Sequence, residues 1–532
     1  MYRHEQFPTL VKKFFSEIGH QTNPWNDLDN LENAIFRAQT FIKRNHKRNV
    51  ASTHEEKIAI THATIFGMQS GQMSIHRAMS MIDQFPALGA HLRIKLLGHG
   101  NKEIWFDRTG IETTLRDLIR EKNDEDIEEI RNGGDFEQDR EIRKTGIMDR
   151  LSLLRPGTKT RIETVWDPAR ERFVTDSEEI AEAIHPKFQG MFESSNKSQE
   201  NISNFINEFP NTIPEGINWD ISIFDIWKVI DQKNKSHPGP GGIPFEAYQY
   251  LKTLTTDVIK RIIDDMTGKN GDPNTIPEKW TKCLLFLVPK SADLVTEEGL
   301  PAFSPGKVRP VMVSPSIIRI ISKCFLEHLM PITQQFVSAE QKGFVRGRNI
   351  MDNIYELQEF FWKNHKENET SYILLVDFSN AFSSIDWGYM IRILTKIGIQ
   401  ENWAKGILAF LRTRVDLKFQ GITKENYVQI GAGCRQGDPL SGLLFAIFLE
   451  PLLWKLRQLE GLTPRGFADD IGIGITRASQ AKFRSICTIF NEFEDASNLK
   501  VNKGKTFWIS CRRRINHRKF KNDKKHFKCN LW

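Results

Sequence analysis

The sequence is poor in cysteine and has no long apolar run. Its 532 residues include six cysteines, and none of them forms a Cys-x-x-Cys pair. Cysteines spread so thinly exclude a disulfide framework and indicate reduced thiols in an intracellular protein. No apolar stretch reaches the roughly 18 residues that a membrane-spanning helix needs. The start, MYRHEQFPTLVKKFF, lacks the apolar segment of a secretory leader. We therefore expect a nuclear or cytoplasmic protein with no membrane partner.

A strong excess of charge of one sign is also missing. There are 74 Lys and Arg residues against 67 Asp and Glu residues, which leaves a net charge of +7. This mild basic bias is compatible with a polyanionic partner but does not establish one. Hydrophobic residues make up 39% and charged residues 27% of the chain. Such a composition is typical of a globular protein, and the length suggests two to four structural units.

The first part of the chain shows no catalytic constellation. Residues 1–192 are mainly helical and polar in pattern, with a short hairpin expected near 160–176. A stretch rich in Ser, Asn, Pro and Gly then predicts a linker over 193–218. Residues 219–270 begin with a helix pattern that leads into the turn-rich HPGPGGIPFEAY. The function of the first region is not indicated by its sequence.

From residue 271 to 510 the pattern alternates between strands and helices. The runs KCLLFLVPK, VRPVMVS and YILLVDF are apolar and β-branched and predict strands. Helices are expected over 316–336, 385–398 and 441–456, and hairpins over 414–433 and 465–475. This order predicts an α+β fold whose antiparallel sheet carries helices on one face. The tail, residues 511–532, is basic and apolar-poor, and we expect it to be disordered.

Three carboxylates stand out in this second part. Asp469 and Asp470 lie at the tip of a predicted tight hairpin, where two adjacent negative charges repel each other. An isolated pair of this kind is most often a solvated turn, but a divalent cation would also offset the repulsion. Asp377 ends the buried run YILLV. Three carboxylates on neighbouring strands suit two Mg²⁺ ions about 3.5–4 Å apart, with Mn²⁺ as a substitute, and this is the chemistry of nucleotidyl transfer.

These carboxylates belong to a series of motifs that resembles the reverse transcriptases, and within them the non-LTR (LINE-like) retrotransposon branch. In chain order the motifs are KNKSHPGPGGIPFEAY (233–248), VPK (288–290), GKVRPV (306–311), QKGFVRGRNIMDNI (341–354), DFSNAF (377–382), RQGDPLS (435–441), FADD (467–470) and NLKVNKGKT (498–506). The first and fourth favour the LINE-like branch over group II intron-type and telomerase-like enzymes. The resemblance implies a right-hand polymerase, with residues 219–270 as an N-terminal extension motif and 271–510 as fingers and palm.

The resemblance also implies roles for individual residues. The side chains of Asp377, Asp469 and Asp470, with the backbone carbonyl of Phe378, would bind the two Mg²⁺ ions. Lys505 would lie near the leaving pyrophosphate and act as its general acid. The resemblance implies an RNA template, a DNA primer and dNTPs as partners of the protein. The remaining residue roles concern the incoming nucleotide.

Six residues are expected to contact that nucleotide, and Phe378 is one of them. A planar guanidinium suits bidentate phosphate contact, so Arg309 together with Lys290 would clamp the triphosphate of a dNTP. Phe382 matches the aromatic steric gate that excludes the 2′-hydroxyl of ribonucleotides, although it is also a plausible core residue. Gln436 and Gly437 would line the nucleotide and template side, where a glycine permits close approach of a flat partner.

Some positions depart from the family pattern. Phe467 stands where many relatives have Tyr, Asn380 where they often have Lys, and Ser383 where they often have Asp. Gly241 replaces the Asp of the usual PGPDG. No thumb and no endonuclease are recognisable, so we expect a piece of a longer element polyprotein. The alternative to an RNA-directed DNA polymerase is a catalytically inactive remnant that binds nucleic acid. An RNA-dependent RNA polymerase is disfavoured by Phe382.

Overall fold

The structure, a computed structural model, describes residues 5–45, 53–69, 73–96, 102–131, 143–144, 146–148, 150–151, 162–210, 213, 216–232, 237–268, 276–365 and 370–511. The basic tail after Cys511 lies outside these ranges, as do residues 233–236 of the upstream motif. No helix within the described ranges is long and apolar enough to cross a membrane. The five cysteines there are all free and buried, namely Cys283, Cys324, Cys434, Cys487 and Cys511.

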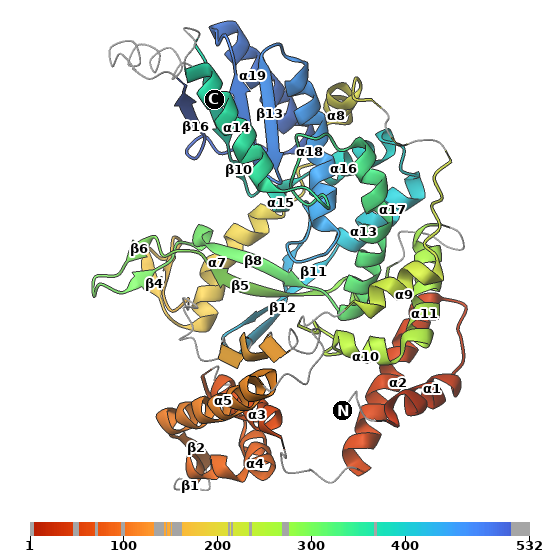
Figure 1. Cartoon of the computed structure of the whole chain (residues 1–532), viewed down its shortest axis with the longest axis vertical. Coiled ribbons are helices and arrows are strands. Elements are labelled where there is room, and N and C mark those ends of the chain that lie inside the picture. Colours follow the sequence, from red (N-terminus) through yellow and green to blue (C-terminus); the bar gives the residue numbers. More distant parts are fainter. Residues whose placement is uncertain are drawn as a thin grey trace.

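An antiparallel sheet forms the centre of the C-terminal half (Figure 1). Its strands run in the order β13 (Leu462–Phe467), β14 (Asp470–Ile475), β9 (Tyr372–Val376) and β16 (Phe507–Ser510). Every neighbouring pair is antiparallel, as the sequence predicts. Helices α16 (Trp387–Lys396), α18 (Ser441–Gln458) and α19 (Gln480–Ser497) supply much of the core beneath it.

The alternation of Ile and Gly in β14 explains how helices cover this sheet. Successive side chains of a strand point to opposite faces, so Ile471, Ile473 and Ile475 all enter the core. Gly472 and Gly474 then face α14 (Ile350–His365), which packs directly against the strand. A Cβ atom at Gly472 would lie 2.6 Å from Leu357, and one at Gly474 would lie 2.8 Å from Phe360. The two glycines therefore allow α14 to approach this face of the strand closely.

A second, mixed sheet corrects one expectation. Its strands run in the order β12 (Ile422–Gln429), β11 (Arg414–Phe419), β5 (Cys283–Pro289) and β8 (Val308–Val313). The sequence correctly predicts the β11–β12 hairpin but assigns it to a single antiparallel sheet. Instead β11 pairs in parallel with β5, some 130 residues earlier in the chain. Local periodicity does not reveal such a partner, because it reports which faces are buried and not which strand lies alongside.

The expected linker at 193–218 contains a packed helix. Helix α8 (Gln199–Ile206) buries Ile202, Phe205 and Ile206 and contacts α16 and α19. Its polar residues dominate the composition, while its few apolar side chains recur at helical spacing and enter the main core. The segment is therefore part of the folded body and not an extended spacer along its whole length.

The N-terminal residues join the fold in separate places. Helices α1 (Phe7–Ser16) and α2 (Pro24–Asn45) pack with α9 (Ile223–Asp231) and α11 (Lys252–Met266) in the main core. The predicted hairpin is present as β3 (Val165–Asp167) and β4 (Arg172–Val174), and with α7 (Ser177–Met191) it packs against the mixed sheet. Other elements in the described ranges are α10 (Phe245–Tyr250), α12 (Glu278–Thr281), β6 (Leu294–Val295), β7 (Pro301–Ala302), η3 (Pro305–Lys307), α13 (Ser316–Phe336), β10 (Phe378–Ser379), α15 (Ala381–Ser384), α17 (Glu401–Leu411) and β15 (Lys500–Val501).

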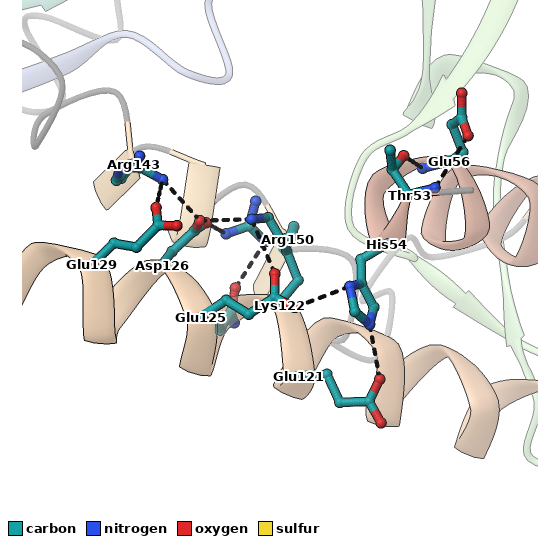
Figure 2. A network of polar contacts seen from close by, with 11 residues as sticks. Thr53, His54, Glu56, Glu121, Lys122, Glu125, Asp126, Glu129, Arg143 and Arg150 are labelled. Carbon is teal, nitrogen blue, oxygen red and sulfur yellow. Dashed lines mark hydrogen bonds and ion pairs between the residues drawn. The ribbon is translucent and has the colours of Figure 1, made fainter. Parts of the chain in front are cut away.

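A small module lies apart from both sheets, at the bottom of Figure 1. It contains α3 (His54–Gln69), α4 (Ile75–Gln84), η1 (Pro86–Ala90), β1 (Leu92–Leu96), β2 (Lys102–Phe106) and α5 (Arg108–Arg131). Figure 2 shows the polar network along α5, where the buried Asp126 lies 2.9 Å from Lys122 Nζ and also pairs with Arg150. His54 contacts Glu121 and Glu125 of the same helix at 3.0 and 3.2 Å. These contacts join α3 and the residues around 150 to α5.

Helix α2 gives a reason for the glycine in the upstream motif. A Cβ atom at Gly241 would lie 2.8 Å from Oε1 of Glu32, whose side chain is buried. Burial raises the pKa of Glu32, and the contact with Lys279 at 3.0 Å opposes that rise. The aspartate usual at position 241 would bring a second carboxylate against Glu32, so the glycine suits the neighbour that this chain provides.

Glu450 makes the stability of the fold depend on pH. It is 2% exposed within α18, and burial raises the pKa of its carboxyl from 4.5 to about 8. The folded state therefore holds a proton that the unfolded state releases, and the free energy of unfolding falls as pH rises from about 4.5 to about 8. At about 1.4 kcal/mol per pKa unit the loss is on the order of a few kcal/mol.

The Glu450→Gln variant has no carboxyl group to titrate at this position. It should melt at a higher temperature than the parent at pH 8 but not at pH 5. Thermal unfolding across that range checks the prediction. The exposed Glu460 offers a matched control, since Glu460→Gln should follow the parent at both pH values. An unchanged pH slope in Glu450→Gln would mean that the buried carboxyl is already ionised in the fold.

Candidate active site

Two neighbouring strands bring the predicted carboxylates together. Asp377 directly follows β9, and Asp470 begins β14. The register pairs Val376 with Ile471, so the two acids lie at the same end of adjacent strands. The turn that joins β13 to β14 consists of Ala468 and Asp469, and Ala468 has a φ of 56°. A positive φ at the first central residue is a feature of the tight turns that join antiparallel strands.

The three carboxylates act on each other electrostatically. Burial raises the pKa of Asp469, and the charges of Asp470 and Asp377 raise it further. Burial and the charge of Asp377 likewise raise the pKa of Asp470. Oδ2 of Asp377 is buried and has no hydrogen-bond partner among the described residues. A cluster of negative charge with an unsatisfied buried oxygen fits the ligand preference of a hard divalent cation.

A cavity of about 520 Å³ opens beside this cluster. Its lining includes Asp377, Asp470 and Lys505 together with apolar side chains of α14, β9 and β16, whereas Asp469 does not line it. As the side chains lie, no three His, Cys, Asp or Glu residues in the described ranges converge closely enough to hold a metal ion. Binding of one ion by all three carboxylates therefore requires their side chains to move together.

Basic residues from two other segments face the carboxylates. Lys505 Nζ lies 3.8 Å from Asp377 Oδ2, and the backbone N–H of Asn502 donates to the Asp377 carbonyl at 2.7 Å. Lys290 directly follows β5, and Arg309 lies in β8, the strand that pairs with β5 in the mixed sheet. Burial lowers the pKa of Lys290, the charges of Arg309 and Lys505 lower it further, and Asp377 opposes them. The two sheets thus present opposite charges to the same space.

Gln341 holds the turn of Ala468 and Asp469 in place through hydrogen bonds. Its side chain is fully buried, and its Oε1 accepts hydrogen bonds from Gly343 N at 2.8 Å and Ala468 N at 3.0 Å. Lys342 N donates to the Gly466 carbonyl at 2.8 Å, and Asn353 Nδ2 donates to the same oxygen at 2.8 Å. The motif QKGFVRGRNIMDNI therefore anchors the hairpin that carries Asp469 and Asp470. The sequence marks this motif without indicating the role, because the partners lie more than 100 residues away.

Replacement of Gln341 by methionine, which is similar in shape, should misplace the turn. Two buried backbone N–H groups would lose their acceptor, at about 1–3 kcal/mol each. If the carboxylates hold the catalytic Mg²⁺ that the sequence resemblance implies, primer extension should be at least tenfold slower and reach half its maximal rate at a higher Mg²⁺ concentration. The exposed Gln335 offers the control Gln335→Met. A Gln341→Met protein with the parental rate and Mg²⁺ dependence would rule out this anchoring role.

The other predicted residues take varied positions. Phe378 is buried, and its ring packs against Phe490 and Phe493. Phe382 is half-buried and stacks on Phe445, with ring centroids 4.4 Å apart and planes at 17°. Phe382 thus lies beside the strand that leads to Asp377 and also belongs to an aromatic cluster. This arrangement is compatible with a steric gate and with a core residue.

The RQGDPLS loop contacts the mixed sheet through its backbone. Met312 N of β8 donates to the Gln436 carbonyl at 2.9 Å. Gly437 has a φ of 109°, and a Cβ atom there would lie 2.5 Å from the Met312 carbonyl oxygen. The glycine therefore permits a close approach of this loop to strand β8. Its expected contact with the nucleotide and template stays a prediction.

Arg435, in the same loop, is a structural residue that the sequence analysis passed over. It is 1% exposed, donates from Nη1 to Cys283 Sγ at 3.2 Å and lies 3.4 Å from Asp438 Oδ2 through Nη2. Cys283 begins β5, so this guanidinium ties the loop to the mixed sheet. A fully buried arginine is rare unless paired, but burial is not visible in the sequence.

The chain thus combines an antiparallel sheet that offers carboxylates at one end with a second sheet that carries basic residues. Residues 288–527 match the family described as reverse transcriptase (RNA-dependent DNA polymerase). This region of the chain is therefore a match to the reverse transcriptase family, and the chain is similar to proteins of non-LTR retrotransposons.

Its similarity to individual relatives is moderate and partial. It is 25% identical over 253 residues to a 149 kDa protein of transposon TX1 from Xenopus laevis, covering 45% of this chain and 18% of that protein. It is 24% identical over 291 residues to the Pol polyprotein of element R2DM from Drosophila melanogaster, covering 52% of this chain and 25% of the relative. An R2 Pol polyprotein from Popillia japonica is 25% identical over 190 residues, with 35% and 25% covered. The chain thus spans at most a quarter of the length of these relatives.

Proposed function

We propose that this chain is an RNA-directed DNA polymerase that copies RNA into DNA by two-metal nucleotidyl transfer as part of a retrotransposon. The observation that carries the proposal is the carboxylate cluster at the end of β9 and β14, with Lys505 paired to Asp377 and Lys290 close enough to feel its charge. Arg309 lies near Lys290. Its substrates would be dNTPs, an RNA template and a DNA primer. The domain assignment that accompanies it has residues 271–510 as fingers and palm and 219–270 as an N-terminal extension.

The carboxylates would hold the catalytic ions. Asp377, Asp469 and Asp470 would bind two Mg²⁺ ions, or Mn²⁺, with help from the Phe378 carbonyl. When bound, such ions lower the pKa of the attacking hydroxyl and stabilise the leaving oxygen. The unsatisfied Oδ2 of Asp377 supports this assignment, as do the pKa values of Asp469 and Asp470, which burial and neighbouring carboxylates raise.

The basic residues would bind and protonate the phosphates. Lys290 and Arg309 would hold the triphosphate, since a guanidinium suits bidentate phosphate contact and an ammonium adds a second positive charge. Lys505 is exposed and pairs with Asp377, so it is free to turn toward a leaving pyrophosphate and donate a proton to it. Phe382 would exclude a ribose 2′-hydroxyl, and Gln436 and Gly437 would border the nucleotide and template.

Primer extension tests the proposal directly. The purified full chain is given an RNA template annealed to a DNA primer, Mg²⁺ and dNTPs, beside the Asp469→Ala/Asp470→Ala variant. We expect extension by the parent, none by the variant, and none by the parent in EDTA. RNA binding by gel shift is measured in the same samples.

The competing function has a distinct outcome. A folded parent that binds RNA in EDTA and extends no primer under any metal would be a nucleic-acid-binding remnant, and the polymerase proposal would fall. Extension by both parent and variant would instead show that the polymerisation occurs without the assigned carboxylates.

A further inference from the structure

Phe344 has a backbone conformation that is unfavourable for its side chain. Its φ is 59°, and it is the only aromatic residue with a positive φ in the part of the chain that the structure describes. Bulky residues rarely adopt this region, and such strain persists only where the surroundings enforce it. Residues held in this way are concentrated at functional sites, so the position of the ring is informative.

The surrounding segment leaves Phe344 little freedom. A Cβ atom at Gly343 would lie 2.1 Å from Ala468 N, so the chain runs directly against the carboxylate turn. Gln341 Oε1 holds the Gly343 N–H, and Arg348 donates to the carbonyls of Val337 and Gln341 at 2.8 and 2.7 Å. Because the loop is held by hydrogen bonds before and after Phe344, this residue keeps its strained backbone conformation.

The Phe344 ring lies against the residue assigned as steric gate. Its centroid is 5.8 Å from that of Phe382, with the ring planes at 82°, an edge-to-face arrangement. The start of α18 leaves space for the Phe344 ring, because residue 442 is a glycine. A Cβ atom at Gly442 would lie 2.4 Å from the ring. Since Phe445 of α18 stacks on Phe382, the gate ring has aromatic neighbours from two elements.

We propose that Phe344 is a second determinant of sugar selectivity, which acts by holding the Phe382 ring in place. The inference rests on the proposed polymerase function and on Phe382 as the gate. A gate discriminates a single hydroxyl group only if its ring cannot turn aside. Loss of one edge-to-face contact should increase the fraction of molecules whose Phe382 ring has turned aside. Ribonucleotide use should therefore rise by roughly threefold to tenfold.

Single-nucleotide incorporation measures this effect. The ratio of kcat/KM for a dNTP to that for the matching rNTP is compared in the full-length parent and in Phe344→Gly, Phe344→Tyr and Phe382→Val. Glycine relieves the strain at positive φ, so Phe344→Gly should melt at or above the parental temperature. We expect its selectivity ratio to fall threefold to tenfold, as estimated above. Phe344→Tyr should keep the parental ratio, and Phe382→Val should lose the most.

The outcomes separate the inference from its premises. A Phe344→Gly protein that is folded and keeps the parental ratio, while Phe382→Val loses it, overturns the role of Phe344 alone. An unchanged ratio in Phe382→Val removes the gate assignment, and the inference with it. A parent that incorporates no dNTP removes the proposed function itself. A ratio lowered in Phe344→Gly and restored in Phe344→Tyr supports the inference, because general damage to the fold would lower both rates and not their quotient.

Discussion

Replacement of Asp470 by asparagine is expected to reduce primer extension by roughly a thousandfold or more while leaving the fold intact. If Asp470 binds the catalytic ions as proposed, its loss removes several kcal/mol of transition-state stabilisation, at about 1.4 kcal/mol per tenfold in rate. The fold should not suffer, because burial and the charge of Asp377 already raise the pKa of Asp470. Removing that charge relieves repulsion with Asp377 and also with Asp469.

Two measurements check this prediction together. Primer extension gives the rate, and thermal melting with and without Mg²⁺ gives the coupling of the metal to the fold. The parent should gain stability from Mg²⁺, whereas Asp470→Asn should gain much less but start from an equal or higher melting temperature. Asp495 is exposed on α19, so Asp495→Asn serves as the matched control and should resemble the parent. Parental extension by Asp470→Asn would exclude this carboxylate from catalysis.

Replacement of Arg435 by methionine is expected to destabilise the protein by about 3 kcal/mol, because it leaves a buried carboxylate without its cation. The side chain of Asp438 is 5% exposed and pairs with Arg435 at 3.4 Å. It keeps hydrogen bonds from Ser322 Oγ at 2.5 Å and Leu440 N at 3.0 Å, which limit the loss. The bond to Cys283 Sγ disappears as well, and with it a tie between the palm loop and the fingers sheet.

A double-mutant cycle in urea isolates the ion pair. Asp438→Asn removes the orphaned charge, so Arg435→Met/Asp438→Asn should be less destabilised than the sum of the single variants. The exposed Arg484 provides the control Arg484→Met, which should stay within about 0.5 kcal/mol of the parent. Additive losses in the cycle would show that the guanidinium acts through packing and the thiol contact, and not through Asp438.

Much of the architecture could be predicted from local pattern. The apolar run before Asp377 predicts a strand that ends in an acid, and RGFADDIGIGI predicts a hairpin with two acids at its turn; both are present in β9, β13 and β14. Strand periodicity and turn chemistry depend on residues within a few positions of each other, so a single sequence is enough to reveal them. The order of the motifs was likewise sufficient to indicate the family.

Long-range partners could not be predicted in this way. The β11–β12 hairpin was correct as a hairpin and wrong in its sheet, since its neighbour β5 lies far away in the chain. Helix α8 was hidden in a polar segment because only a few of its side chains enter the core. The roles of Gln341 and Arg435 depend on burial and on hydrogen bonds to distant backbone, neither of which leaves a local pattern.

The sequence by itself determined which residue types are available for catalysis and on which strand ends they stand, because strand periodicity and turn formation are short-range properties. The tertiary structure decided what holds those residues in place. The Gln341 side chain holds the turn of Asp469 and Asp470, Arg435 joins its loop to the mixed sheet, and the Phe344 ring contacts Phe382 edge to face. Each of these contacts joins segments separated by tens to hundreds of residues, and only the packing of the whole core brings such segments together.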